Sequence, residues 1–112
     1  MTSIDVGFNS LDEEAALGIV RAARQHDRMT FLGLAGCGIG PSGAKEIAEY
    51  VSVTAVLNKI VLSANKIKDE GAIALGEALK MNKSLKELEL MECGIGPNGG
   101  KAIAAALREG TA

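Results

Sequence analysis

The hydrophobic positions of this chain recur every 28 residues, so that its 112 residues divide into four rows. Within each row, aliphatic side chains follow the pattern L-x-x-L-x-L-x-x-N/C-x-L, in which L is an aliphatic residue and x is any residue. The rows agree in at least seven columns without an insertion, which chance does not explain and which indicates an array of repeats. The rows, called repeats 1 to 4 below, are residues 1–28, 29–56, 57–84 and 85–112.

Each repeat combines a strand pattern with a helix pattern. Apolar and polar residues alternate over 85–90, as in a strand that buries one face. Helical spacing of apolar residues follows in each repeat and predicts a helix with one buried face. Proline suits the first turn of a helix and aspartate favours its dipole, so these residues indicate where the helices begin. The expected starts are Asp12, Pro41, Asp69 and Pro97.

One column of the repeat holds asparagine and cysteine in alternation. Asparagine carries both hydrogen-bond donors and acceptors, so at the end of a strand it can satisfy backbone groups of the turn. Cysteine is compact and apolar, and it can fill the same position with fewer hydrogen bonds. We therefore assign a structural role to the four residues of this column, which are Asn9, Cys37, Asn65 and Cys93.

The length of the unit and this alternation resemble the leucine-rich repeats of the ribonuclease-inhibitor type. The resemblance covers the whole chain and implies an α/β fold, a right-handed βα leucine-rich-repeat solenoid of four units in a single domain, 1–112. A parallel sheet would form the concave side and the helices the convex side, since each strand feeds a parallel neighbour. Repeats of this subtype occur in cytosolic inhibitors, NOD-like receptors, Ran GTPase-activating proteins and actin-filament capping proteins. The sequence does not choose among them.

Composition narrows the function. Apolar residues make up 47% of the chain, aromatic residues only 3%, and the net charge is −2. Nucleic-acid binders carry a basic stripe with stacking aromatic side chains, so we expect no nucleic-acid partner. No apolar run approaches the roughly 20 residues that span a bilayer, and the start lacks the features of a signal peptide. We therefore expect a cytoplasmic protein without membrane contact.

A glycine motif follows the strand of repeats 2 and 4. Residues 38–43 and 94–99 both read G-x-G-x-x-G, the pattern of a dinucleotide-binding turn. However, the same columns of repeat 3 hold 66–71, which lacks this pattern. Pro41 and Pro97 also remove amides that would help to bind a phosphate. We interpret the glycines as turn residues and expect no cofactor.

The remaining candidates for chemistry are two cysteines and one histidine. Cys37 and Cys93 stand two repeats apart, and strands are spaced by about 4.8 Å, so their separation exceeds the roughly 7 Å that a disulfide allows. Buried, reduced thiols are expected instead. His26 falls in a helix-to-strand turn, away from both cysteines in the pattern. No metal site and no catalytic arrangement is indicated, so we expect a protein that is not an enzyme.

The resemblance implies that a protein partner binds on the concave face. Four strands of about 17 Å, spaced by about 4.8 Å, form a face of about 320 Å². A standard interface takes about 800 Å² from each partner, so the chain alone would bind weakly. Strand alternation predicts the partner-binding residues of this face, which are Asp5, Phe31, Lys59, Val61, Glu87, Glu89 and Met91.

The ends of the array leave three functional hypotheses open. Solenoids need terminal caps, and because the four repeats take up all 112 residues we expect no capping segment at either end. The chain is thus expected to be a protein-interaction scaffold that forms a piece of a longer solenoid. Alternatively, it is a structural unit that assembles into a homo-oligomer through its end strands or end helices. A third reading is a GTPase-activating protein of the Ran type.

Overall fold

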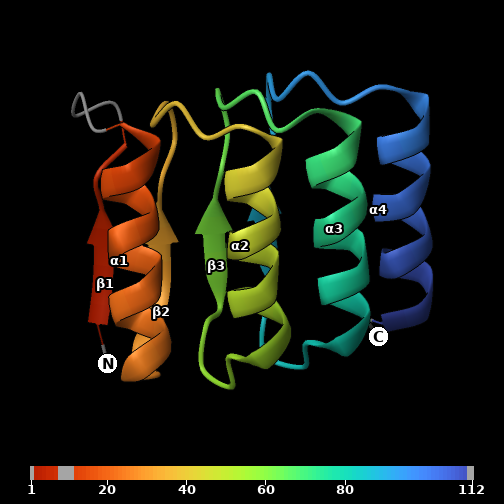
Figure 1. Ribbon diagram of the computed structural model, residues 1–112. Helices are drawn as coiled ribbons and strands as arrows, with labels where there is room; N and C mark the ends of the chain where they lie inside the picture. Colours follow the sequence, from red (N-terminus) through yellow and green to blue (C-terminus); the bar gives the residue numbers. More distant parts are fainter. Residues whose placement is uncertain (1, 8–11, 111–112) are drawn as a thin grey trace.

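The computed structural model describes residues 2–7 and 12–110 and contains four strand–helix units in succession (Figure 1). The four strands form one parallel sheet in the order β1-β2-β3-β4. The four helices stand side by side in a second layer that covers one face of the sheet (Figure 1). The predicted α/β solenoid is confirmed. Its elements are β1 Thr2–Asp5, α1 Glu13–Gln25, β2 Met29–Gly33, α2 Pro41–Val53, β3 Lys59–Val61, α3 Lys68–Met81, β4 Glu87–Glu89 and α4 Pro97–Gly110.

Residues that share a column of the repeat lie side by side across the sheet. Leu32 of β2 lies beside Ile60 of β3, which lies beside Leu88 of β4. Leu32 and Ile60 are fully buried between the sheet and the helices. The core therefore consists of aliphatic ladders, each built from one residue per repeat, and its stability comes from the apolar area that stacking removes from water.

Two helices begin at the predicted residue, and the other two, α1 at Glu13 and α3 at Lys68, begin one residue away from it. The Asp12 side chain caps α1 by accepting a hydrogen bond from the Ala15 amide at 2.9 Å. Helices α2 and α4 begin at Pro41 and Pro97, and α3 begins at Lys68, one residue before Asp69. The sequence thus places all four helix starts to within one residue.

Small residues bring neighbouring helices close together. A Cβ on Gly71 of α3 would lie 2.8 Å from the Cβ of Ala44 of α2. A Cβ on Gly76 would lie 2.9 Å from the carbonyl oxygen of Ala102 in α4. Such distances are too short for carbon–carbon or carbon–oxygen contact, so a side chain at either glycine would push the helices apart. These glycines set the spacing between repeats.

The length and apolarity of a helix decide whether it can cross a bilayer. Within the described ranges, none of the helices combines the length and the apolarity that crossing a bilayer requires.

Candidate functional site

The face of the sheet that points away from the helices, called the concave face below, carries side chains from all four repeats. Strand register puts Ser3, Phe31, Lys59 and Glu87 in one row across it. The next row holds Asp5, Gly33, Val61 and Glu89. Met91 follows β4 and is 69% exposed. The structure therefore brings six of the seven predicted partner-binding side chains together on one face, and Met91 lies two residues beyond the end of β4.

Lys59 occupies the middle of this face. Its Nζ lies 3.1 Å from Glu89 Oε2 and 3.4 Å from Glu87 Oε2. It also lies 5.9 Å from the centre of the Phe31 ring, within the range of a cation–π contact. The hydrogen bond to Glu89 and the charge of Glu87 raise the pKa of Lys59. The ammonium stays charged at neutral pH and links the aromatic ring of β2 to the acidic strand β4.

At the other edge, Asp5 folds back onto the sheet. Its Oδ1 accepts a hydrogen bond from the Gly7 amide at 3.0 Å. A Cβ on Gly33, the neighbour of Asp5 in β2, would lie 2.6 Å from that oxygen. Gly33 therefore leaves room for the carboxylate. The concave face is acidic at both edges, with Phe31 and Val61 between them.

Behind the sheet, Asn65 joins two repeats through its side-chain amide. Its Oδ1 accepts hydrogen bonds from the amides of Cys37 at 2.9 Å and Ile39 at 3.0 Å. Its Nδ2 donates to the carbonyls of Leu34 at 2.8 Å and Leu62 at 3.0 Å. Because Asn65 is buried, these bonds replace water for turn groups of repeats 2 and 3. Asn9, in the same column, lies outside the described residues.

The two cysteines of this column are buried and free. The thiol of Cys93 donates to the Leu62 carbonyl at 3.1 Å, and that of Cys37 donates to the Ala35 carbonyl at 3.6 Å. Burial raises the pKa of both thiols. A thiol that stays protonated is a poor nucleophile, so this environment suits packing rather than covalent chemistry.

The glycine turns of repeats 2 and 4 hold carboxylates of the preceding repeat. Glu13 Oε2 accepts from the Gly40 amide at 2.8 Å. Asp69 Oδ1 accepts from the amides of Gly96 at 2.6 Å and Gly99 at 3.0 Å. A Cβ on Gly99 would lie 2.7 Å from that oxygen. The turn interpretation of the motif is therefore incomplete, because the glycines also make space for an acidic side chain.

A second polar ladder, which sequence reasoning missed, lies at the opposite end of the strands. Asn82 Nδ2 donates to the Val51 carbonyl at 2.7 Å, and its Oδ1 accepts from the Leu85 amide at 2.6 Å. Thr54, in the same column one repeat earlier, donates its hydroxyl to Asp27 Oδ1 at 2.6 Å. Two polar residues 28 positions apart, Thr54 and Asn82, were the available signal.

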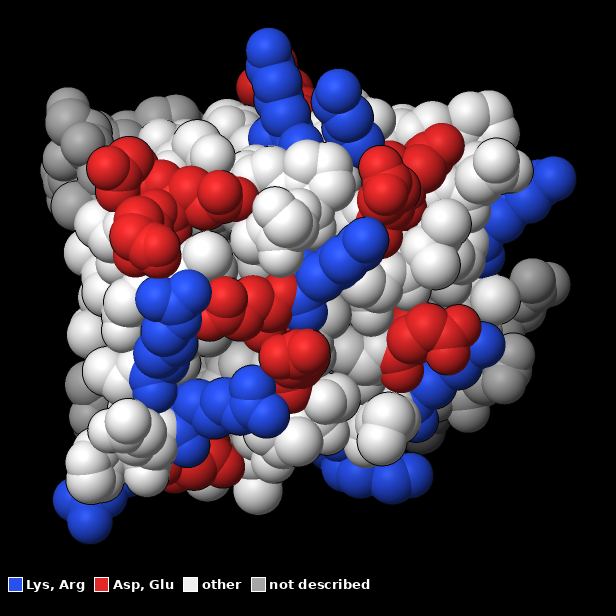
Figure 2. Space-filling model, viewed as in Figure 1, with Lys and Arg blue, Asp and Glu red and all other residues white. Residues whose placement is uncertain are grey.

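The helix side of the molecule mixes both signs of charge (Figure 2). Arg21 pairs with Glu46 at 2.6 Å and with Glu14 at 3.2 Å, while Arg24 pairs with Glu49 at 3.5 Å. These arginines are therefore engaged in ion pairs. They do not form a basic patch.

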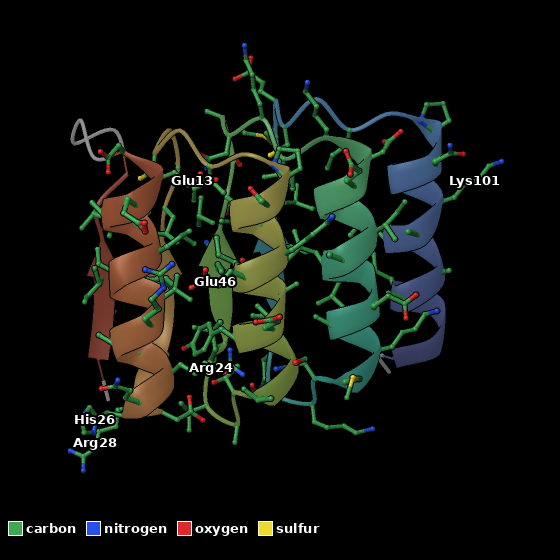
Figure 3. All side chains as sticks on the ribbon, in the orientation of Figure 1. Glu13, Arg24, His26, Arg28, Glu46 and Lys101 are labelled. Atoms are coloured by element: carbon green, nitrogen blue, oxygen red, sulfur yellow. The ribbon has the colours of Figure 1, made fainter. Side chains whose placement is uncertain are left out.

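His26 is the C-cap of α1 and lies at the lower end of that helix in the view of Figure 3. Its side chain is exposed. In the part of the chain that the structure describes, no three His, Cys, Asp or Glu residues form a group that could hold a metal ion.

Known proteins with similar sequences share the repeat. Residues 29–48, 56–76 and 82–104 match the family described as Leucine Rich repeat. NACHT, LRR and PYD domains-containing protein 5 of Bos taurus is 37% identical over 97% of this chain and 10% of its own length. RAN GTPase-activating protein 2 of Arabidopsis thaliana is 30% identical over 87% of this chain and 18% of its own length. The chain thus spans a small part of the curated relatives that it matches.

A solved structure has the same arrangement of elements. It is described as Leiomodin-1 Actin-Binding Site 2 (ABS2), and the two structures superpose with a TM-score of 0.85. The match covers 97% of this chain and 65% of the other, at 24% sequence identity. This likeness concerns the fold.

Proposed function

The chain belongs to the leucine-rich-repeat family, of the ribonuclease-inhibitor-like subtype, and on that basis we propose that its 112 residues act as one non-catalytic domain that binds a protein partner on the concave face. One observation carries this proposal: strand register collects side chains from all four repeats into adjacent rows on that face. A surface built in this way presents many groups to one partner at once. Repeat solenoids use such surfaces for binding.

The chemistry of the face favours a basic partner with apolar anchors. The rows of the concave face carry three carboxylates, those of Asp5, Glu87 and Glu89, and one ammonium, that of Lys59. Met91 is 69% exposed, which leaves an apolar contact available beside the acidic strand. Opposite charge across an interface speeds association and fixes orientation. We therefore expect a partner segment that combines Lys or Arg with aliphatic residues.

Size supports a contribution from further repeats. The concave face of about 320 Å² is less than half of what one partner buries in a standard interface. The chain spans about a tenth of the length of its bovine relative. We therefore propose that it works as a section of a longer solenoid, in which neighbouring repeats extend the same face. Binding by this section alone should be weak.

Peptide display tests the concave face directly. Random peptides selected on the wild-type chain should be enriched in basic and aliphatic residues. Their affinity should fall in the double variant Glu87→Gln/Glu89→Gln and become less sensitive to salt. Glu70→Gln is the matched control, because Glu70 is an exposed carboxylate on the helix side. Peptides that bind both variants as well as wild type would disprove the concave site.

Activation of a GTPase is the alternative that the RAN GTPase-activating protein relative suggests. Asn65 is a polar side chain of the turn that follows β3, and its amide oxygen already accepts two backbone hydrogen bonds. Its amide nitrogen donates to two further backbone carbonyls. This favours a structural role for Asn65, and for that reason the proposal is limited to binding.

A further inference from the structure

Two specific pairs of residues meet at the junction between repeats 2 and 3. The first pair is Ala44 and Gly71, which fit because only one of them carries a Cβ: a Cβ on Gly71 would lie 2.8 Å from that of Ala44. The second pair is Lys45 and Glu70, whose charged atoms are 3.8 Å apart. Helices α2 and α3 carry these residues and stand next to each other (Figure 1).

Each of the two outer faces of the molecule carries one residue of each corresponding pair. Two repeats after Ala44 stands Gly100, and two repeats before Gly71 stands Ala15. At the internal junction the alanine is on the earlier repeat and the glycine on the later one. At the outer faces the glycine is on repeat 4 and the alanine on repeat 1. Both positions are exposed, and a Cβ on Gly100 would meet no neighbouring atom of the described residues within 4 Å.

The charged pair is kept as well. Two repeats after Lys45 stands Lys101, and two repeats before Glu70 stands Glu14. Lys101 projects from α4 away from the other helices (Figure 3). Glu14 is 72% exposed in its side chain, although it also contacts Arg21 at 3.2 Å. The outer face of α4 therefore presents a cation, and α1 presents the matching anion.

Apolar surface is available at both ends. The outer side of repeat 1 has a hollow of about 290 Å³ that is lined by Ile4, Ile19, Ala22 and Ala23, among others. At the other end, Leu107 of α4 is 52% exposed, whereas Val51 in the same column of repeat 2 is 1% exposed. Val51 is covered because repeat 3 stacks on repeat 2. Leu107 would be covered in the same way by another repeat of that type.

From these matches we propose that a second copy of this chain stacks its repeat 1 on repeat 4 of the first, reproducing the junction between repeats 2 and 3. Gly100 then meets Ala15 of the copy, and Lys101 meets its Glu14. The contact is heterologous, so each added copy leaves a free end and association is open-ended. In this form the neighbouring repeats of the longer solenoid come from separate copies of the chain, and the stacking itself does not require that a partner binds the concave face.

Two features make this junction weaker than its internal counterpart. In the sheet, Glu89 would lie beside Asp5 of the copy, at the position where Gly33 lies beside Val61 inside the chain. This places two carboxylates together, with Lys59 at 3.1 Å from Glu89 as partial compensation. The two shorter dimensions of the molecule, 26 and 18 Å, also limit each end face to about 470 Å². We therefore expect association at high micromolar concentration.

Exchange of one methyl group between the two faces tests the proposal. Gly100→Ala places a Cβ against that of Ala15 in the copy, and overpacking of this kind should weaken association by at least about tenfold. Adding Ala15→Gly to the same chain restores one alanine and one glycine at the contact, and it should restore association. Sedimentation velocity over a range of concentrations measures both effects. Circular dichroism confirms that the variants fold, which we expect because both positions are exposed.

Gly18→Ala is the matched control, since it adds the same methyl group to the exposed surface of α1. Repeat 3 has Ala74 in that column, so the internal junction already accepts alanine there. This variant should associate like wild type. A wild-type chain that stays monomeric at high micromolar concentration would overturn the proposal. So would association that Gly100→Ala leaves unchanged, or that the double variant fails to recover.

Discussion

The carboxylate of Asp69, in repeat 3, accepts a hydrogen bond from the backbone amide of Gly96, in repeat 4, at 2.6 Å. The same oxygen accepts from the Gly99 amide at 3.0 Å. Glu13 stands in the same relation to Gly40, two repeats earlier, at 2.8 Å. Each glycine turn is therefore an anion-binding turn whose anion is a side chain of the preceding repeat.

We expect Asp69→Ala to destabilise the fold by about 1–3 kcal/mol, because two partly buried amides at the start of α4 lose their acceptor. Asp69→Asn keeps an oxygen acceptor and should cost less. Urea denaturation followed by circular dichroism measures the free energy of unfolding of each variant. Glu70→Gln, at the neighbouring exposed carboxylate, is the control and should leave stability near the wild-type value. Equal effects at the two positions would contradict the role of Asp69.

Asn65→Ala should be more damaging than Asp69→Ala. It removes an amide that makes four backbone hydrogen bonds of 3.0 Å or less, so the buried amides of Cys37 and Ile39 lose their acceptor and two carbonyls lose a donor. The expected loss is about 3 kcal/mol or more, which is large for a single substitution. Asn65→Cys should fall between wild type and alanine, since Cys93 fills the same column in repeat 4 with its thiol 3.1 Å from the Leu62 carbonyl. Denaturation midpoints that rank cysteine with alanine would contradict this explanation.

The sequence predicts most of the fold because its information is periodic. A column such as Leu32, Ile60 and Leu88 identifies a buried ladder without any knowledge of the partner strands. Asn65 is predictable for the same reason, as a polar residue at a fixed place in an apolar repeat. The candidate partner-binding face follows from strand alternation once the strands are placed.

Contacts between columns were harder to predict. Asp69 suits the start of its own helix, and nothing in its row indicates that it also binds the turn of the next repeat. The environment of Lys59 depends on rotamers of Glu87 and Glu89 that spacing does not specify. Likewise, the position of the Asp5 carboxylate next to Gly33 depends on the register between β1 and β2. These features depend on how neighbouring repeats meet in three dimensions.

Tyr50 provides a test of packing without hydrogen bonding. Its ring stands in a column of alanines and is 1% exposed, and its hydroxyl has no hydrogen-bond partner among the described residues. Tyr50→Phe removes a buried hydroxyl that has no hydrogen-bond partner, so stability should be unchanged or slightly higher. Tyr50→Ala should cost about 3–5 kcal/mol through the cavity that it leaves. Thermal unfolding distinguishes the two, and a clear loss with phenylalanine would indicate that the hydroxyl is bonded.

The buried thiols predict how stability changes with alkaline pH. Burial raises the pKa of Cys37 and Cys93 in the folded chain, whereas an unfolded thiol titrates near pH 8.5, so above that pH the unfolded state is the first to lose its protons. The stabilisation is therefore complete below about pH 8.5 and is lost as pH rises through the folded pKa values. The free energy of unfolding should fall over the interval that begins at about pH 8.5 and extends upward to the raised pKa values of the folded thiols. The double variant Cys37→Ala/Cys93→Ala has no thiols to ionise, so its stability, although lower overall because two buried side chains are truncated, should change little over that interval. Urea titrations at several pH values measure both slopes, and parallel slopes would exclude the thiols as the cause.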